Sequence, residues 1–259
     1  MSASASETGQ AGVMASHIDR VAVLTPMRTE LAPVAKAFGL GRSRIGNLDA
    51  STGRRHDTEI VACVTGIGPA AAVRATEALL DAVRVSHVLV CGVAGGVGPT
   101  LAVRDVFWPE TAWYVDTDER FPATPLPGVE CAGTVATSRE FHTEPEVIAG
   151  YAAGGAIAID METAAIAAVC AARHVPWSAV RAISDPAVGG ADADMLTLLN
   201  TDGSPRIGAS LRYLGTHPRR IPALIQIARD GTAAATRAAR AAHAAVDGAA
   251  SPGGPRVPE

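Results

Sequence analysis

Short β-branched runs alternate with helical stretches along the chain, and this alternation limits the possible folds more than any other feature of the sequence. Residues 20–24 precede a helical pattern over 26–38, and residues 60–65 precede one over 69–83. Further strands are expected at 87–91, 105–115, 156–159 and 177–183, and further helices at 161–173, 207–214 and 218–245. Strands joined by helices form sheets with helices on both faces. The pattern therefore predicts an α/β fold, a single domain with a central mixed, mostly parallel sheet flanked by helices.

The length and composition favour one domain. A chain of 259 residues with 48% hydrophobic but only 4% aromatic residues can bury one large core of aliphatic side chains. Residues 1–18 are rich in Ser, Ala and Gly, and residues 248–259 are rich in Pro and Gly. Neither end carries enough apolar surface to offset the entropy lost on ordering. We expect one domain over 19–247 between two disordered tails.

The charge pattern argues against nucleic acid and membrane partners. The net charge is −4, and acidic and basic residues are interspersed without a basic stripe that would hold a phosphate backbone. No apolar stretch reaches the roughly 18 residues that a membrane span needs, and the first residues lack the basic and apolar segments of a signal peptide. We expect a cytoplasmic protein.

The cysteines and histidines do not form a metal-binding pattern. Four cysteines are far apart, mostly inside apolar runs, and seven histidines are scattered singly. Zinc sites need clustered ligands, whereas an isolated cysteine in an apolar run packs as a small hydrophobic residue. We expect buried, reduced thiols and no metal.

Three segments bring carboxylates to the ends of predicted strands, where ligands bind in open α/β sheets. They are Thr-Pro-Met-Arg-Thr-Glu at 25–30, Ala-Ile-Asp-Met-Glu-Thr at 158–163 and Val-Arg-Ala-Ile-Ser-Asp at 180–185. In the first segment, Thr25 can cap a helix that has Pro26 at its first position. That start would place Glu30 in the second turn.

Two glycine segments also follow predicted strands, at 65–69 and 91–98. The spacing Gly66-x-Gly68-x-x-Ala71 fits a dinucleotide-binding fingerprint. The next strand, however, ends without the acidic residue that would bind an adenosine ribose. A nicotinamide or flavin oxidoreductase is therefore disfavoured, and no cofactor is expected.

These segments, in this order, resemble the purine nucleoside and uridine phosphorylase superfamily, most closely its nucleosidases that act on methylthioadenosine and S-adenosylhomocysteine. The most specific parts are Ala-Gly-Gly-x-x-Pro-Thr-Leu-x-Val-x-Asp at 94–105, Asp160-Met161-Glu162 and residues 180–185. Residues 186–230 look more like the hopanoid-associated branch of that superfamily, as does the aliphatic Val93. The resemblance implies a nucleoside phosphorylase-like fold, a small nucleoside substrate and a homodimer or higher homo-oligomer. Residues 108–115 are a candidate interface.

The resemblance also implies roles for the acidic residues. Asp185 would donate a proton to N7 of a departing purine, Glu162 would accept hydrogen bonds from the ribose hydroxyls, and Glu30 would activate the attacking water. Arg181 would be a cation beside the nucleophile and the ribose. Other substrate-binding positions would be Val93, Gly95, Phe141, His142, Met161 and Ser184. The alternatives are a helix cap for Asp185, solvent-exposed positions for Glu30 and Glu162, and core packing for Phe141.

Three activities fit the resemblance: hydrolysis, phosphorolysis and nucleoside binding without catalysis. Phosphorylases of the superfamily hold phosphate with an arginine before the glycine segment and a hydroxyl within it, where this chain has Val90 and Val93. We therefore expect hydrolysis, although Arg28 could compensate for those losses. The three acidic residues together argue against a non-catalytic module, while Asp160 replaces the usual glutamate of the family motif.

Overall fold

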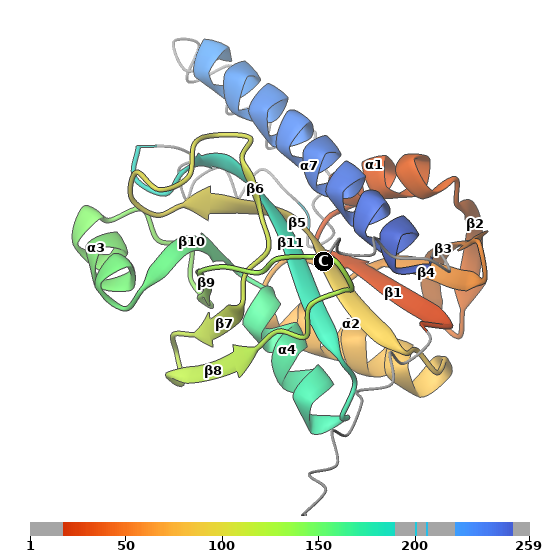
Figure 1. Ribbon diagram of the computed structural model, residues 1–259. Coiled ribbons are helices and arrows are strands. Elements are labelled where there is room, and N and C mark those ends of the chain that lie inside the picture. Colours follow the sequence, from red (N-terminus) through yellow and green to blue (C-terminus); the bar gives the residue numbers. More distant parts are fainter. Residues whose placement is uncertain (1–17, 190–199, 201–205, 207–220, 251–259) are drawn as a thin grey trace, which may run out of the picture.

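The computed structural model describes residues 18–189 and 221–250, with the single residues 200 and 206, and is shown in Figure 1. The predicted N-terminal tail lies almost wholly outside these residues, and so does the helix expected at 207–214. At the C-terminal end the last helix continues to Ala250, three residues into the segment expected to be a tail.

Eleven strands form one sheet. They are β1 (Arg20–Thr25), β2 (Gly41–Ile45), β3 (Leu48–Arg55), β4 (Thr58–Val64), β5 (His87–Gly96), β6 (Val106–Phe107), β7 (Thr111–Tyr114), β8 (Glu119–Pro122), β9 (Thr134–Thr137), β10 (Ala156–Asp160) and β11 (Trp177–Pro186). Their order is β2-β3-β4-β1-β5-β10-β9-β7-β8, with β11 paired to β5 and β6 paired to β11. The predicted mixed sheet is confirmed. Its centre, β4, β1, β5 and β11, is parallel, and antiparallel pairs such as β2–β3 and β7–β8 lie towards its ends.

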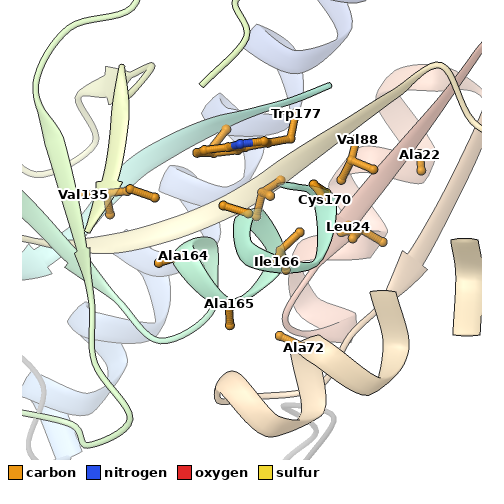
Figure 2. Packing of buried hydrophobic residues seen from close by; sticks show 14 of the residues in the cluster. Ala22, Leu24, Ala72, Val88, Val135, Ala164, Ala165, Ile166, Cys170 and Trp177 are labelled. Carbon is orange, nitrogen blue, oxygen red and sulfur yellow. The ribbon is translucent and has the colours of Figure 1, made fainter. Parts of the chain in front are cut away.

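Helices cover both faces of the sheet, as expected (Figure 1). They are α1 (Arg28–Phe38), α2 (Pro69–Ala82), α3 (Pro145–Ala153), α4 (Thr163–Ala172) and α7 (Ile221–Ala250). On one face, α2 and α4 pack against Leu24 and Val88, and Trp177 is buried in the same cluster, as Figure 2 shows. On the other, α1 and α7 pack against the opposite side chains of the same strands, such as Val23 and Leu89. Each central strand alternates between the two cores because successive side chains point to opposite faces.

The strands that carry the carboxylates are longer than the sequence indicated. The apolar runs predicted strands over 87–91 and 177–183, but β5 continues through its glycines to Gly96 and β11 continues to Pro186. The two strands pair along this whole length, with one bulge after Ile183. Pairing within a sheet supplies the hydrogen bonds that keep a glycine segment extended, and local sequence does not show this pairing. The expected strand over 105–115 divides into β6 and β7 around Pro109, which has no N–H for the ladder.

The cysteines are free thiols. Burial raises the pKa of Cys63, Cys91 and Cys170 to about 12, so these three stay protonated and unreactive. Within the described residues, no group of three or more His, Cys, Asp or Glu side chains is arranged to hold a metal ion. None of the helices in that part of the chain combines the length and apolar character needed to cross a bilayer.

Candidate active site

A fully buried arginine on β11 is the centre of the candidate site. The guanidinium of Arg181 forms an ion pair with Asp160, with 2.7 Å between Nη2 and Oδ2. It also donates hydrogen bonds to the hydroxyl of Thr163, 2.7 Å from Nη2 and 3.1 Å from Nε. Burial alone would lower the pKa of Arg181, but the surrounding carboxylates outweigh burial and raise it, so the side chain stays charged. A buried cation is costly unless it is paired, and Asp160 is the partner of this arginine.

Asp160, the last residue of β10, connects that arginine to the start of α4. Besides pairing with Arg181, its carboxylate accepts hydrogen bonds from the Thr137 hydroxyl at 2.6 Å and from the Glu162 and Thr163 amides at 3.2 Å each. The hydroxyl of Thr163 donates to it as well. Asp160 thus binds the free amides at the helix start and holds Arg181 at the same time. From the sequence, Asp160 was noted only as a replacement of the usual glutamate; its position at the end of the strand predicted over 156–159 was the available signal.

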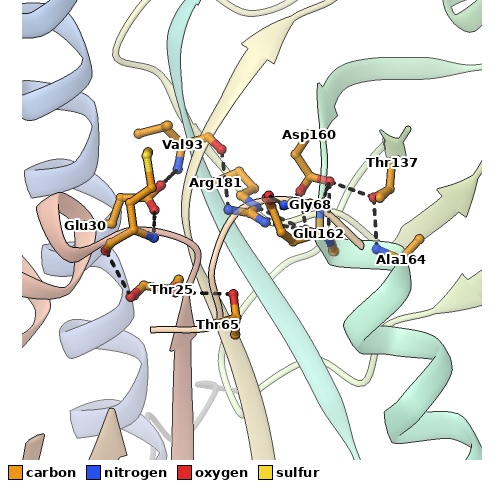
Figure 3. A network of polar contacts seen from close by, with 12 residues as sticks. Thr25, Glu30, Thr65, Gly68, Val93, Thr137, Asp160, Glu162, Ala164 and Arg181 are labelled. Carbon is orange, nitrogen blue, oxygen red and sulfur yellow. Dashed lines mark hydrogen bonds and ion pairs between the residues drawn. The ribbon is translucent and has the colours of Figure 1, made fainter. Parts of the chain in front are cut away.

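Glu162 is buried beside this pair, so the alternative of a solvent-exposed position is wrong. Its Oε1 accepts a hydrogen bond of 2.7 Å from the amide of Gly68, in the glycine segment after β4 (Figure 3). Gly68 has φ +88°, a left-handed conformation that side chains rarely adopt. Burial, followed by repulsion from Asp160, raises the pKa of Glu162 to about 8, against the opposing effects of Arg181 and the Gly68 amide. The segment that resembled a dinucleotide fingerprint therefore holds a carboxylate.

Glu30 is buried as well, which excludes the solvent-exposed alternative for this residue too. Its carboxylate accepts hydrogen bonds from the amides of Met27 at 2.9 Å and Val93 at 2.8 Å. Burial raises the pKa of Glu30 to about 7, although Arg181 and the two amides lower it. A carboxyl group with this pKa can exchange a proton near neutral pH.

The expected start of the first helix is wrong by two residues. α1 begins at Arg28 with Met27 as its cap, and Glu30 lies in the first turn, not the second. Thr25 is the last residue of β1; its carbonyl accepts a hydrogen bond from the Thr65 amide at 2.8 Å. The hydroxyl of Thr25 donates to backbone carbonyls, those of Met27 and Cys63, and accepts no hydrogen bond from a helix amide in the described part of the chain, so Thr25 does not cap the helix.

Gly92 explains how Glu30 and Arg181 come together. A Cβ atom at this position would lie 2.4 Å from Nη1 of Arg181 and 2.6 Å from Oε1 of Glu30. The carboxylate from α1 and the guanidinium from β11 therefore both pack directly against the backbone of β5 at Gly92, where a side chain would displace them. The sequence indicated that glycines allow a close approach but did not single out Gly92, which lies inside an apolar strand.

Asp185 lies on the same strand as Arg181, four residues further on, and is half-buried. It is paired in register with Gly95, directly after the bulge in β11. The hydroxyl of Ser184 shares its single proton between this carboxylate and the carbonyl oxygen of Ala94, which is 3.3 Å away. Asp185 therefore belongs to a strand and does not cap a helix. Its place is the carboxyl edge of the sheet, beyond the buried group of Glu30, Glu162 and Arg181.

The other positions expected to bind substrate are half-buried, which leaves part of each side chain or backbone accessible. They are Val93, Gly95, Phe141, His142, Met161 and Ser184. His142 packs edge-on against Tyr151 of α3, with ring centroids 5.9 Å apart, and its Nδ1 is 3.4 Å from Glu144. These contacts fix His142 to its own segment and to α3 rather than to the Arg181 group.

Fold and site together define a class: an α/β protein of the nucleoside phosphorylase type, with buried carboxylates around one arginine at the carboxyl edge of a mixed sheet. The family model of the Phosphorylase superfamily matches residues 20–130 and 127–206. The chain belongs to this superfamily.

Individual relatives agree with that assignment. The 5'-methylthioadenosine/S-adenosylhomocysteine nucleosidase of Bacillus subtilis (strain 168) is 28% identical over 197 residues, 64% of this chain and 85% of the relative. The structure of such a nucleosidase from Neisseria meningitidis, in complex with methylthio-immucillin-A, covers 89% of this chain and 99% of its own at 21% identity, with a TM-score of 0.68. A native futalosine hydrolase of Helicobacter pylori strain 26695 matches with a TM-score of 0.67 at 20% identity, covering 89% of this chain and 98% of its own.

Proposed function

We propose that the protein hydrolyses the N-glycosidic bond of a purine nucleoside, a 5'-modified adenosine, to the free base and a ribose derivative. The observation that carries this proposal is the close approach of Glu30 and Arg181 at Gly92, with Glu162 near enough to help raise the pKa of the guanidinium. Breaking this bond leaves positive charge on the ribose and negative charge on the base. Carboxylates beside the sugar and a proton donor beside the base match that distribution, and the relatives named as nucleosidases support it.

Four residues, Glu162, Glu30, Asp185 and Arg181, have roles in the proposed reaction. Glu162 accepts hydrogen bonds from the ribose hydroxyls and so orients the sugar beneath the base. Glu30 takes a proton from a water molecule, whose oxygen bonds to the anomeric carbon as the bond to the base breaks. Asp185 gives its proton to N7 of the leaving base, which departs neutral. Arg181 holds the carboxylates in place and stabilises the ionised form of Glu30.

We prefer water to phosphate as the nucleophile because apolar residues, Val90 and Val93, occupy the two positions at which phosphorylases of the superfamily bind phosphate. Val90 is fully buried, and Val93 offers only its backbone amide, which already donates to Glu30. The test is to incubate the protein with methylthioadenosine, with and without phosphate, and to separate the products. We expect adenine and the free sugar at the same rate in both. Strict phosphate dependence, with a sugar 1-phosphate as product, would show phosphorolysis instead.

The substitution Asp185→Asn is expected to lower the rate of base release by about 10²-fold or more, because an amide cannot protonate the leaving base. Adenine release measured by chromatography checks this expectation. The substitution Asp105→Asn is the matched control, since Asp105 accepts a hydrogen bond from Ala102 in an exposed turn. Equal rates for wild type and Asp185→Asn would remove Asp185 from the mechanism, and no base release from either would favour a non-catalytic binding module.

The ionisation of Glu30 is expected to make kcat/KM rise with pH through about 7. The pKa of Glu30 is raised to about 7, so the carboxylate that accepts the proton forms only as the pH passes this value. Below it, kcat/KM falls about tenfold for each pH unit, as for any single essential base. Initial rates between pH 5 and 9 on a neutral nucleoside measure this. A profile that is flat from pH 5 to 7 would mean that another group is the base.

The same proposal includes a cytoplasmic location and a homo-oligomeric state, with no nucleic acid or membrane partner. Free cysteines on the described chain are typical of a reducing compartment. In the candidate interface at 108–115, Trp113 contacts Tyr151 and Arg120 of its own chain, which leaves less of its ring for a second subunit.

A further inference from the structure

A large groove lies beside the glycine segment that holds Glu162, and its charged residues are almost all arginines. The groove has a volume of about 1330 Å³ and is lined mainly by residues from α1, β2, β3, the glycine segment after β4, α2 and the segment after β9. Among the described residues that line it, the charged ones are Arg28, Arg42, Asp49, Arg74 and Arg139. Four positive charges therefore face one negative charge, in a protein whose net charge is −4. A concentration of one sign in a cleft attracts ligands of the opposite sign.

Three of the four arginines in this groove make no ion pair within the described residues. Arg28 is 3.8 Å from Asp49, and both side chains are exposed, so this pair is weak. Within the described part of the chain, no ion pair or side-chain hydrogen bond engages the guanidinium groups of Arg42, Arg74 or Arg139. These three groups retain all their donors for a ligand, and guanidinium donors match carboxylate and phosphate oxygens.

The groove adjoins the candidate active site. Gly68 lines the groove and also donates its amide to Glu162 (Figure 3). Arg28 and Leu31 line it from α1, on either side of Glu30 in the sequence. Arg139 lies next to Ser138, whose amide donates to the carbonyl of Asp160 at 3.1 Å. A sugar held by Glu162 would therefore have the arginines beyond one of its ends.

We propose that this groove binds the 5' substituent of the nucleoside, and that this substituent carries a negative charge as a carboxylate or a phosphate. The proposal rests on the proposed function, because Glu162 must hold the ribose for the 5' carbon to face the groove. The base and the scissile bond lie at the opposite side of the sugar, near Asp185. The arginines thus select the substrate and take no part in bond cleavage.

The experiment compares ligands with charged and uncharged 5' substituents. They are C-nucleoside analogues of adenosine, in which a carbon–carbon bond replaces the scissile bond, so that binding is measured without turnover. One analogue ends its 5' thioether in a carboxylate, the second in the uncharged carboxamide, and the third carries a 5' phosphate. We expect at least one anionic analogue to bind about tenfold more tightly than the carboxamide in calorimetry, and this ratio to shrink as salt is added.

Arginine variants test whether the groove is the origin of the preference for anionic analogues. The double substitution Arg74→Met with Arg139→Met is expected to reduce this preference to about twofold or less, since charge recognition is removed. Arg240→Met removes one exposed arginine of α7, outside the groove, and should keep the full preference. If the double variant also loses carboxamide binding, each single variant replaces it, with an expected loss of about threefold.

The outcomes separate this proposal from the proposed function. Equal binding of all three analogues, or a preference that survives in the arginine variants, overturns the charged 5' substituent, whether or not the wild type hydrolyses nucleosides. Binding of none of the analogues overturns both proposals. A preference for the carboxylate alone, or for the phosphate alone, supports the proposal and identifies the anion.

Discussion

Replacement of Arg181 by methionine is expected to lower the free energy of unfolding by about 3 to 5 kcal/mol, the usual effect of removing one partner of a buried ion pair. Three buried carboxyl groups, those of Glu30, Asp160 and Glu162, would lose the cation that lies among them. Methionine fills most of the volume of the side chain, so that a cavity contributes little to the loss. Urea unfolding followed by circular dichroism measures the effect.

The pH dependence distinguishes lost charge pairing from poor packing. The pKa values of Glu30 and Glu162 are already raised by burial, and loss of Arg181 would raise them further. For such groups the folded state is favoured by protonation, so the destabilisation should be smaller at pH 5 than at pH 8. Arg120→Met, at an exposed arginine that stacks on Trp113, is the control and should cost less than about 1 kcal/mol. An equal loss at both pH values would mean that packing dominates.

Replacement of Glu30 by glutamine is expected to lower kcat by about 10³-fold, within the range for loss of a general base. The amide has the size of the carboxyl group but cannot take the proton of the attacking water. Both oxygens of Glu30 accept hydrogen bonds from backbone amides, so the NH2 group of glutamine would have to face one of these N–H donors. A modest loss of stability is therefore expected as well.

Adenine release at pH 8 tests this prediction, with thermal melting to confirm that the variant is folded. Glu77→Gln is the matched control, since Glu77 is an exposed residue of α2 and its loss should leave the rate unchanged. The rise of kcat/KM with pH through about 7 should also disappear in Glu30→Gln. A rate within tenfold of wild type would assign the base to another residue.

The elements that the sequence predicted well are those with strong local patterns. The apolar run before Glu30 appears as β1, and the Ala-rich segment after Glu162 appears as α4, buried on nearly all sides. The hairpin of β2 and β3 was not predicted. Its residues are largely polar and half-exposed, so they carry no clear alternation, and only the pairing of β3 with β4 makes them a sheet.

The amino-acid sequence by itself determined the α/β alternation, the sheet edge at which the acidic residues lie, and the likeness to the superfamily, because these depend on local patterns and short motifs. Only the tertiary structure decided which groups meet: Asp160 with Arg181, Gly68 with Glu162, and Glu30 over Gly92. These contacts join residues far apart in the chain, and their energies depend on burial. The raised pKa values and the arginine-lined groove therefore exist only once the chain has folded.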